Sequence, residues 1–433
     1  MKSLTNTFFF FTLLPFVSLI PLSTDVQPIS FFFGLLIIFI LTIKNELIIT
    51  TIDVYIIFLA ILSFIYVSYE AEGLYENGVT SANTSVRRQV GMTFVLVTYV
   101  ASKNVFKDFN VKILIFVTFI QSLFTILNLV TPAAYNFIAS NLLRTIKIDF
   151  TVYDGFRGAS ALTSEPSYLA GSALTYFALA TLFLKKKEIS NKYFFIITIL
   201  CIFMLLMSKS ALGAVLTAGV ILYLIIDYIS FKYTFICILT FLMLYNFIPQ
   251  TFYDGIRYNK FVENSRGLRL IQKATESGIE RFLSDASFKD KITPVYIGFI
   301  SLGQAPFGGG IGHFPLAANK NLDSVKNNIN GCRTVDWLED GTKSYTCVTK
   351  SPSAFGLYTT EFGYLFIFFI CFIMLKSNKN FLQSMFVKGS ALIFIVSSMS
   401  IVFPLTWLIM AGLVYDNKIY NKDKINKSIK EIL

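Results

Sequence analysis

The chain has 433 residues, of which 55% are hydrophobic, 16% are aromatic and only 15% are charged. Its mean hydropathy of +0.64 lies far from the balance of a water-soluble globular protein. The formal net charge of +11 resides largely in short loops and in the C-terminal tail, so membrane topology explains it better than binding to nucleic acid.

Apolar segments close to the roughly 20 residues that a membrane-spanning helix needs recur along the chain. They cover residues 6–22, 29–43, 47–69, 90–102, 111–130, 167–184, 193–207, 211–226, 233–247, 357–375 and 389–415. Because these segments are continuous rather than alternating, they favour helices over the strands of a barrel. The sequence therefore predicts an all-α, polytopic membrane helical bundle.

The number of spans depends on the last of these segments. Residues 389–415 contain Pro404 and could form one kinked helix or two short ones, and a Lys-rich tail on the inner side favours two. We therefore expect about 12 spans, with about 11 as the alternative. The first segment has the basic start of a signal peptide, but no cleavage site of the A-x-A type follows it, so we expect a retained span.

Basic residues collect in short loops on the cytoplasmic side of membrane proteins. This rule places the Lys-rich loops 102–112, 185–192 and 376–388 inside the cell. Alternation then places 131–166 and 248–356 outside. The expected organisation is a transmembrane bundle over 1–247 with an outer loop, a large periplasmic loop over 248–356, and C-terminal spans with a cytoplasmic Lys-rich tail over 357–433.

The outer stretch GFRGASALTSEPSYLAG (155–171) carries the first candidate residues. Arg157 lies on the side where the positive-inside rule disfavours it. Ser164 or Glu165 can cap the next helix, and Pro166 suits its first turn. The plain interpretation is a solvated arginine and a helix cap. The functional one is that Glu165 orients Arg157 or an acceptor hydroxyl, beside a helix N-terminus that favours an anion.

A basic cluster lies within the large outer segment. Apolar residues at helical spacing over 268–283 predict an amphipathic helix, and Arg266, Arg269 and Lys273 share a different face of it. Acidic residues are interspersed, so one interpretation is an ordinary solvated face. The other is that Arg266 and Arg269 form bidentate hydrogen bonds to phosphate oxygens.

The glycine-rich stretch APFGGGIGHFP (305–315) permits a tight turn and a close backbone approach to a ligand. It is not a nucleotide-binding loop, because no GK[ST] follows it. It either forms a turn that ends an outer helix or places His313 near the reacting groups as a base or hydrogen-bond partner. His313 is the single histidine and there is no C-x-x-C pair, so we expect no metal site.

The five cysteines divide by location. Cys201, Cys237 and Cys371 fall within spans, where we expect small core residues. Cys332 and Cys347 bracket a polar loop in the large outer segment. A disulfide could join these two in an oxidising compartment, and the alternative is a pair of free thiols.

Ionisable residues are scarce within the spans, whereas a transporter needs them along its pathway. Lys209 lies in the turn MSKSALG (207–213), which alternation places outside. It either snorkels to the membrane interface or adds to the cations available at the outer face.

Five short elements follow one another along this chain. They are FRG and SEPSY within 156–168, MSKSALG at 207–213, the basic outer segment, PFGGGIGHF at 306–314 and SAFGLYTTEFGYLFIF at 353–368. Together with the many spans, they resemble the O-antigen polymerase (Wzy-type) and O-antigen ligase family of bacterial surface-polysaccharide enzymes. The resemblance covers the architecture of most of the chain and implies a GT-C-like bundle in the bacterial inner membrane.

The resemblance implies a glycosyltransferase that works without metal or other cofactor at the periplasmic face. Its substrates would be oligosaccharide repeat units linked to undecaprenyl pyrophosphate in the membrane lipid, and a chain-length co-polymerase would be a partner. Cationic side chains would stabilise the departing pyrophosphate, and a base would take the acceptor's proton. The candidate cations are Arg157, Lys209, Arg266, Arg269 and Lys291. Lys291, or Lys289, stands where the family has an arginine. The candidate bases are Glu165 and His313.

Residues 349–356 read TKSPSAFG, where ligases of this family have a His-Asn pair, and this difference argues for a polymerase. The alternatives are an O-antigen ligase and a flippase for lipid-linked oligosaccharide. The nearly apolar spans disfavour the flippase, which needs a polar route through the membrane.

Overall fold

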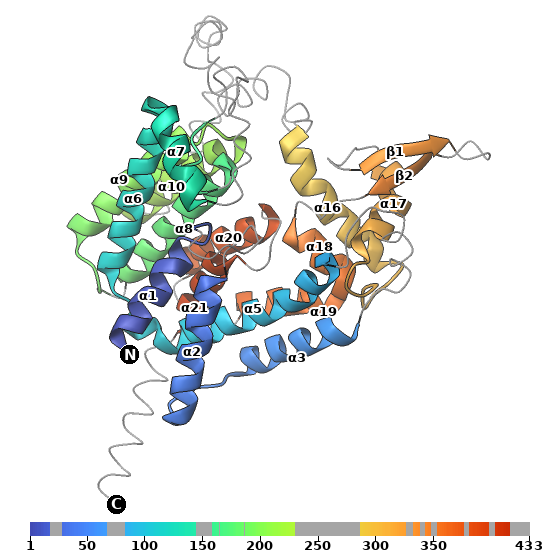
Figure 1. The fold of residues 1–433 in the computed structure, drawn as a ribbon, viewed down its shortest axis with the longest axis horizontal. Coiled ribbons are helices and arrows are strands. Elements are labelled where there is room, and N and C mark those ends of the chain that lie inside the picture. The colour runs from blue at the N-terminus through green and yellow to red at the C-terminus, as the bar shows by residue number, and fades with distance from the viewer. Residues whose placement is uncertain are drawn as a thin grey trace, which may run out of the picture.

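The computed structural model describes most of the chain, and Figure 1 shows that it is built almost entirely from helices. The described residues are 1–17, 28–66, 83–143, 158–163, 165–185, 187–229, 286–325, 332–337, 343–347, 353–375, 381–397 and 403–415.

Helices make up the described N-terminal half. They are α1 (Lys2–Leu13), α2 (Ile29–Ile43), α3 (Thr51–Ile65), α5 (Asn83–Val105), the 3-10 turn η3 (Phe106–Asp108), α6 (Val111–Val130), α7 (Pro132–Leu142), α8 (Pro166–Lys185), α9 (Asn191–Met207) and α10 (Ala211–Ile229). Helices α2 and α6 have the bounds that the apolar segments predict. The first segment differs, because Pro15 disfavours helical geometry at Leu14 and α1 ends at Leu13.

The described C-terminal half adds one hairpin to the helices. Its elements are α16 (Ala286–Leu302), α17 (Phe314–Val325), β1 (Cys332–Trp337), β2 (Lys343–Cys347), α18 (Ala354–Phe362), α19 (Tyr364–Leu375), α20 (Phe381–Ser397) and α21 (Pro404–Val414). Apart from the antiparallel pair β1–β2, the described chain is helical, as expected.

Two of the apolar segments are divided. Residues 389–415 contribute to two helices, α20 and α21, and Pro404 takes the first position of α21, where its missing N–H costs nothing. The segment 357–375, expected as one helix, is broken at Gly363 between α18 and α19. The expected span 233–247 and the amphipathic helix over 268–283 lie outside the described residues.

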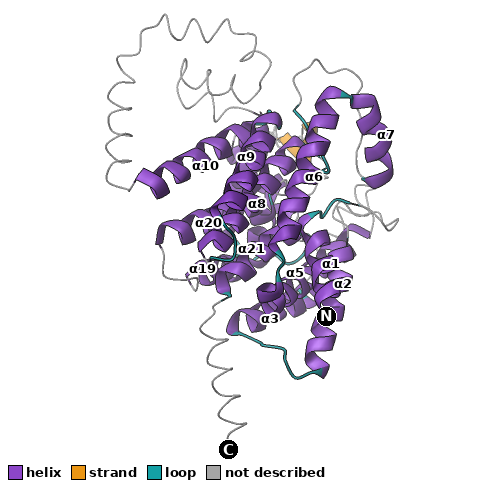
Figure 2. Ribbon diagram, turned by 90° about the vertical axis from the view of Figure 1, so that its left-hand side faces the viewer, coloured by secondary structure: helices purple, strands orange, loops and turns teal. Residues whose placement is uncertain are grey.

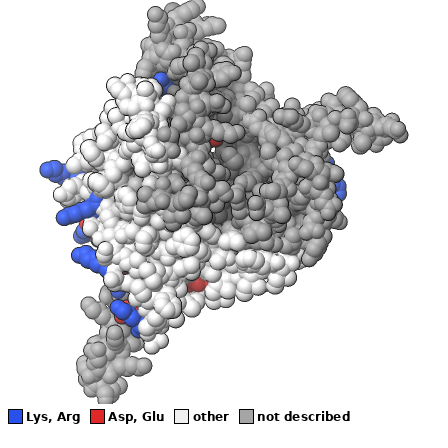
Figure 3. Space-filling model, in the orientation of Figure 1, with Lys and Arg blue, Asp and Glu red and all other residues white. Residues whose placement is uncertain are grey.

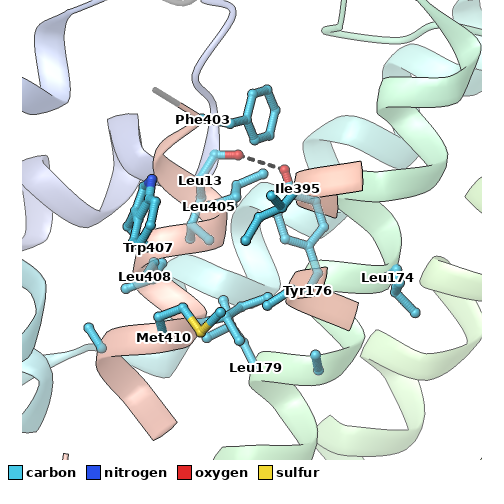
Figure 4. Packing of buried hydrophobic residues seen from close by; sticks show 14 of the residues in the cluster. Leu13, Leu174, Tyr176, Leu179, Ile395, Phe403, Leu405, Trp407, Leu408 and Met410 are labelled. Carbon is cyan, nitrogen blue, oxygen red and sulfur yellow. Dashed lines mark hydrogen bonds between the residues drawn. The ribbon is translucent and has the colours of Figure 1, made fainter. Parts of the chain in front are cut away.

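Helix α8 is the central element of the fold. It packs against α6, α9, α10, α20 and α21, and Figure 2 shows it among these helices. Around it, side chains from α1, α20 and α21 form a buried apolar core (Figure 4). Within this core the Tyr176 hydroxyl donates to the Leu13 carbonyl at 2.6 Å, and buried Trp407 packs on the ring of Phe369.

Helix α6 exposes apolar side chains and buries polar ones, the reverse of a helix in a water-soluble protein. Its exposed residues are Phe116, Phe119, Leu123, Ile126 and Leu129. Its buried polar residues are Thr118, Gln121, Ser122, Thr125 and Asn128. Exposed apolar faces also occur on α2, α3 and α9. Contiguous apolar faces of this kind are suited to lipid rather than water.

The length of the helices agrees with this interpretation for part of the bundle. In the described part of the chain, two helices, Val111–Val130 and Pro166–Leu184, are long and apolar enough to cross a membrane. Shorter apolar helices, among them α2, α3 and α9, accompany them in the described ranges. These features support a membrane protein.

One end of the bundle is basic. Exposed lysines stand at the helix ends there, namely Lys44, Lys107, Lys112, Lys187 and Lys192, and several of the basic side chains visible in Figure 3 gather along one edge of the molecule. Ring contacts of Phe106 with Phe183 and Tyr415 join the ends of α5, α8 and α21 at this place. We call it the basic end.

The opposite helix ends form a second group. The end of α6 and the start of α7 meet residues 158–163, these residues meet the end of α9, and Phe16 packs on Tyr168 and Phe403 at the starts of α8 and α21. Helices α1, α6 and α9 therefore run away from the basic end, while α8 and α21 return to it. The directions of these five helices relative to one another are the ones that alternation between the lysine-rich loops predicts.

Candidate functional site

The structure brings two of the sequence motifs together at the end of the bundle opposite to the basic end. The Ala159 N–H donates to the Met207 carbonyl at 2.9 Å, and a Cβ on Gly158 would lie 1.8 Å from the Ser208 carbonyl oxygen. Only glycine fits this contact. We call residues 158–163, Glu165 and 208–210 the turn cluster.

Side chains from α6 and α7 hold the irregular backbone of the turn cluster. The Ser160 N–H donates to Asn128 Oδ1 at 2.8 Å, and the Leu162 N–H donates to Gln121 Oε1 at 3.1 Å. The Tyr135 hydroxyl donates to the Ala161 carbonyl at 2.6 Å. Burial raises the pKa of Tyr135 above its ordinary value of 10.0, so the hydroxyl remains a donor at physiological pH.

Glu165 stands at the exposed entrance to α8. The helix begins at Pro166, as expected, and the Leu169 N–H donates to the Glu165 carbonyl. The Glu165 side chain accepts a hydrogen bond from the Ser167 hydroxyl at 3.2 Å. Glu165 therefore occupies a capping position and at the same time presents an exposed carboxylate beside the turn cluster.

Lys209 follows the end of α9 in left-handed backbone geometry, with φ of 45°. Its N–H donates to the Leu206 carbonyl, and its side chain is partly exposed. A non-glycine residue with positive φ is strained, and such strain often occurs at functional sites. Ala161, also in the turn cluster, has φ of 48°.

The glycine-rich stretch joins the break between α18 and α19. The Gly309 and Gly310 N–H groups donate to the carbonyls of Thr360 and Glu361, both at 3.0 Å, and so satisfy the end of α18. A Cβ on Gly308 would lie 2.2 Å from the Glu361 carbonyl oxygen, and one on Gly363 would lie 2.1 Å from the Pro306 oxygen. We call residues 306–313, Tyr66 and 360–364 the kink cluster.

The backbone donors of this stretch are directed at the protein itself. The Ile311 N–H donates to the Tyr66 carbonyl at 2.9 Å and the His313 N–H to the Gly310 carbonyl at 3.1 Å. The Gly312 N–H donates to Glu361 Oε1 at 2.9 Å. These groups already have acceptors, and the close backbone approach that the glycines permit is to α18 in this structure. The stretch does form a turn after a helix, α16.

The kink cluster also contains a histidine and a glutamate. The ring of His313, which is partly buried, stands where a Cβ of Gly309 would be. Glu361 is fully buried and lies inside an otherwise apolar segment, and it was not singled out from the sequence. An acidic residue within such a segment is a signal that could have found it.

The remaining candidates have different outcomes. Arg157, Arg266 and Arg269 lie outside the described residues. Lys291 belongs to α16, and its side chain is not among those described. Helix α16 packs against α18 and α20, so this part of the segment 248–356 is joined to the bundle.

Cys332 and Cys347 are direct partners in the antiparallel pair β1–β2. Residues directly opposite each other in such a pair have Cα atoms about 4.5–5.5 Å apart, within the range of about 4.4–6.8 Å that a disulfide spans. The backbone therefore places the two cysteines suitably for the predicted bridge. Within the described ranges, no group of three or more His, Cys, Asp or Glu could hold a metal ion.

Comparison with models of known protein families finds no match, and comparisons with curated proteins and with solved structures find none either.

Proposed function

We propose that this chain is a polysaccharide polymerase similar to the O-antigen polymerase and ligase family. It would transfer a growing glycan from polyprenyl pyrophosphate onto a lipid-linked repeat unit. The observation that supports this most is the turn cluster, where the segment that follows Arg157 packs against the turn that carries Lys209. Two cation-bearing motifs thereby share one end of an apolar bundle.

The proposed orientation of the protein in the membrane follows from the basic end. The positive-inside rule assigns this end to the cytoplasm of the bacterial inner membrane, so that the turn cluster faces the periplasm. The kink cluster would face the same side, because α3 starts at the basic end and Tyr66, which follows α3, donates to the Gly308 carbonyl. With the segments outside the described residues, the proposed topology has about 12 spans.

The proposed reaction is an inverting glycosyl transfer. The acceptor hydroxyl oxygen attacks the anomeric carbon of the donor sugar, and the bond from that carbon to the pyrophosphate oxygen breaks. Polyprenyl pyrophosphate leaves with the electron pair, and Arg157 and Lys209 stabilise its negative charge. Arg266, Arg269 and Lys291 of the large outer segment would complete this cationic site.

Glu165 is the general base in this proposal and receives the proton of the acceptor hydroxyl. A base must lie within hydrogen-bond reach of the proton that it takes, and Glu165 is an exposed carboxylate in the same cluster as Lys209. His313 belongs to the kink cluster, and its proposed part is a hydrogen bond to the acceptor sugar.

A flippase is the rival from another class. Among described residues, the buried charges within helices include Asp53, Lys103 and Glu361. Asp53 and Lys103 pair with each other, and Glu361 binds the glycine turn. These charges hold helices and turns together, which favours an enzyme at the membrane face over a polar pathway through the bundle.

Replacement of Arg157 tests the proposal. In a strain that makes the native glycan, Arg157→Ala should abolish long chains and leave single repeat units, because the leaving pyrophosphate loses a charge-assisted donor. The glycan profile on gels measures this, and Lys192→Ala at the exposed basic end is the matched control. Normal chain lengths with well-inserted Arg157→Ala protein would refute the assignment.

The glycan profile of a deletion strain separates the rival functions. A lost polymerase leaves single repeats on the lipid core, and a lost ligase leaves unattached polymer. A lost flippase leaves lipid-linked intermediates on the cytoplasmic face. The first profile is the one expected here.

A further inference from the structure

Two amide side chains on α6 stand out among the buried residues of the bundle. Gln121 is fully buried and Asn128 is 8% exposed, and they lie seven residues apart on one face of the helix. The Gln121 side-chain oxygen accepts a hydrogen bond from the Leu162 N–H of the turn cluster, and the Asn128 side-chain oxygen accepts one from the Ser160 N–H. The opposite face of α6 is apolar and exposed.

The other polar residues of this face behave differently. Thr118, Ser122 and Thr125 each donate to a carbonyl one turn earlier in α6 itself, so they need no partner outside the helix. The amides reach across to another segment. Burying a polar group without a hydrogen bond costs several kcal/mol in an apolar medium, so each amide oxygen and the backbone N–H from which it accepts satisfy each other.

The backbone that these amides hold is strained and almost inaccessible. Residues 159–163 are buried, and Ala161 adopts φ of 48°. Non-helical backbone in an apolar bundle persists only where protein groups satisfy it. Here the side-chain oxygens of Asn128 and Gln121 accept hydrogen bonds from the N–H groups on either side of Ala161, and the Tyr135 hydroxyl donates to the Ala161 carbonyl.

This anchored segment lies between two residues of the proposed site. Arg157 directly precedes Gly158, and Glu165 comes two residues after Thr163. The Thr163 hydroxyl donates to the carbonyls of Ser160 and Glu165. A displacement of about 1 Å at a catalytic group can reduce a rate by about a hundredfold. The rigidity of this segment therefore determines how the flanking charges meet a substrate.

We propose that Asn128, Gln121 and Tyr135 are positioning residues that fix the turn cluster, and thereby set the placement of Glu165 and of Gly158, to which Arg157 is bonded. The effect on catalysis rests on the proposed function. The effect on the backbone does not, because it follows from hydrogen bonds that exist whatever the reaction.

The first experiment measures the backbone alone. A cysteine at Arg157→Cys is labelled in spheroplasts with a membrane-impermeant maleimide, with the protein lacking this substitution as background. Adding Asn128→Leu should change the labelling rate at least about threefold, because the segment loses an anchor and samples other conformations. Asn128→Asp keeps an acceptor oxygen and should restore the original rate. Thr125→Ala, on the same buried face, should leave it unchanged.

The second experiment measures turnover on chains that retain Arg157. With a synthetic polyprenyl-pyrophosphate donor, Asn128→Leu should lower kcat about tenfold or more and leave KM within about twofold, since the groups that act in the transition state are displaced. Asn128→Asp should recover most of kcat. Tyr135→Phe, which removes only the hydroxyl, should give a smaller loss of kcat and serves if Asn128→Leu fails to accumulate.

The two measurements separate two kinds of failure. If labelling and kcat are both unchanged in well-inserted Asn128→Leu and Tyr135→Phe, the positioning role is refuted. If labelling changes and Asn128→Asp restores it, positioning stands even when polymer synthesis is unaffected, and in that case the proposed function of the site fails. A loss of protein that is equal in Asn128→Leu and Asn128→Asp would also refute the role of the acceptor oxygen.

Discussion

Single residues in this protein show how backbone geometry and charge can be separated experimentally. Lys187 and Lys209 both adopt left-handed geometry, with φ of 58° and 45°, and each donates its N–H to a carbonyl three residues earlier. Lys187 lies at the basic end, whereas Lys209 lies in the turn cluster beside Gly158. The strain is shared, so any difference between the two positions must come from the side chain.

Substitution by glycine exploits this pairing. Lys209→Gly and Lys187→Gly should each stabilise the protein by up to about 1 kcal/mol, because glycine adopts positive φ without the strain of a Cβ. The midpoint of thermal unfolding in detergent measures this. Only Lys209→Gly should reduce polymer formation, by about tenfold or more, since a cation near the leaving pyrophosphate is lost. Equal activity of the two variants would remove Lys209 from the proposed site.

At the scale of elements, the sequence predicts helices well where one helix is continuous and local. Helices α2 and α6 begin and end where the apolar segments do, because hydropathy alone decides whether a stretch suits lipid. The break at Gly363 was not predictable in this way. It depends on Pro306, whose carbonyl accepts the Tyr364 N–H at 2.8 Å, and that partner is nearly sixty residues away in the chain.

The candidate site shows the same division between local and long-range information. The motifs around Glu165 and Lys209 could be found from residue type and expected topology, and the structure brings their segments together. Asn128, Gln121 and Tyr135 were missed because the partner of a buried polar group is not encoded locally. A pair of amides spaced seven residues apart in an apolar span was the available signal.

The hairpin β1–β2 makes a prediction about an element. Its register places Cys332 opposite Cys347, and we expect a disulfide there because the large outer segment faces an oxidising compartment in the proposed topology. A bridge that closes a loop of about 15 residues contributes about 3 kcal/mol. Alkylation in denaturant without reductant, followed by mass spectrometry, should modify Cys201 and Cys371, which are free thiols, and spare Cys332 and Cys347.

Reduction before alkylation should then expose both hairpin cysteines, and Cys332→Ser should free Cys347 without reduction. If Cys332 and Cys347 also react in the first step, the bridge does not form and the hairpin depends on its packing against α17.

At the scale of the whole molecule, the distribution of charge and polarity indicates how the bundle is oriented. Exposed lysines mark one set of helix ends, while the turn cluster and the far end of α3 lie at the other. Between them, α6 turns its polar residues inward and its apolar residues outward. In the proposed polymerase, an arrangement with both clusters on one side would allow donor and acceptor lipids to reach a common face without crossing the membrane.

Single cysteines in the full-length chain test this orientation. In spheroplasts treated with an impermeant maleimide, Lys209→Cys and Phe307→Cys should be labelled, because both positions would face the periplasm and Phe307 is 68% exposed. Lys187→Cys and Lys192→Cys should be labelled only after the membrane is permeabilised. Labelling of Lys209→Cys from the cytoplasmic side alone would place the turn cluster away from the periplasmic substrates, and the proposed polymerase could not act on them.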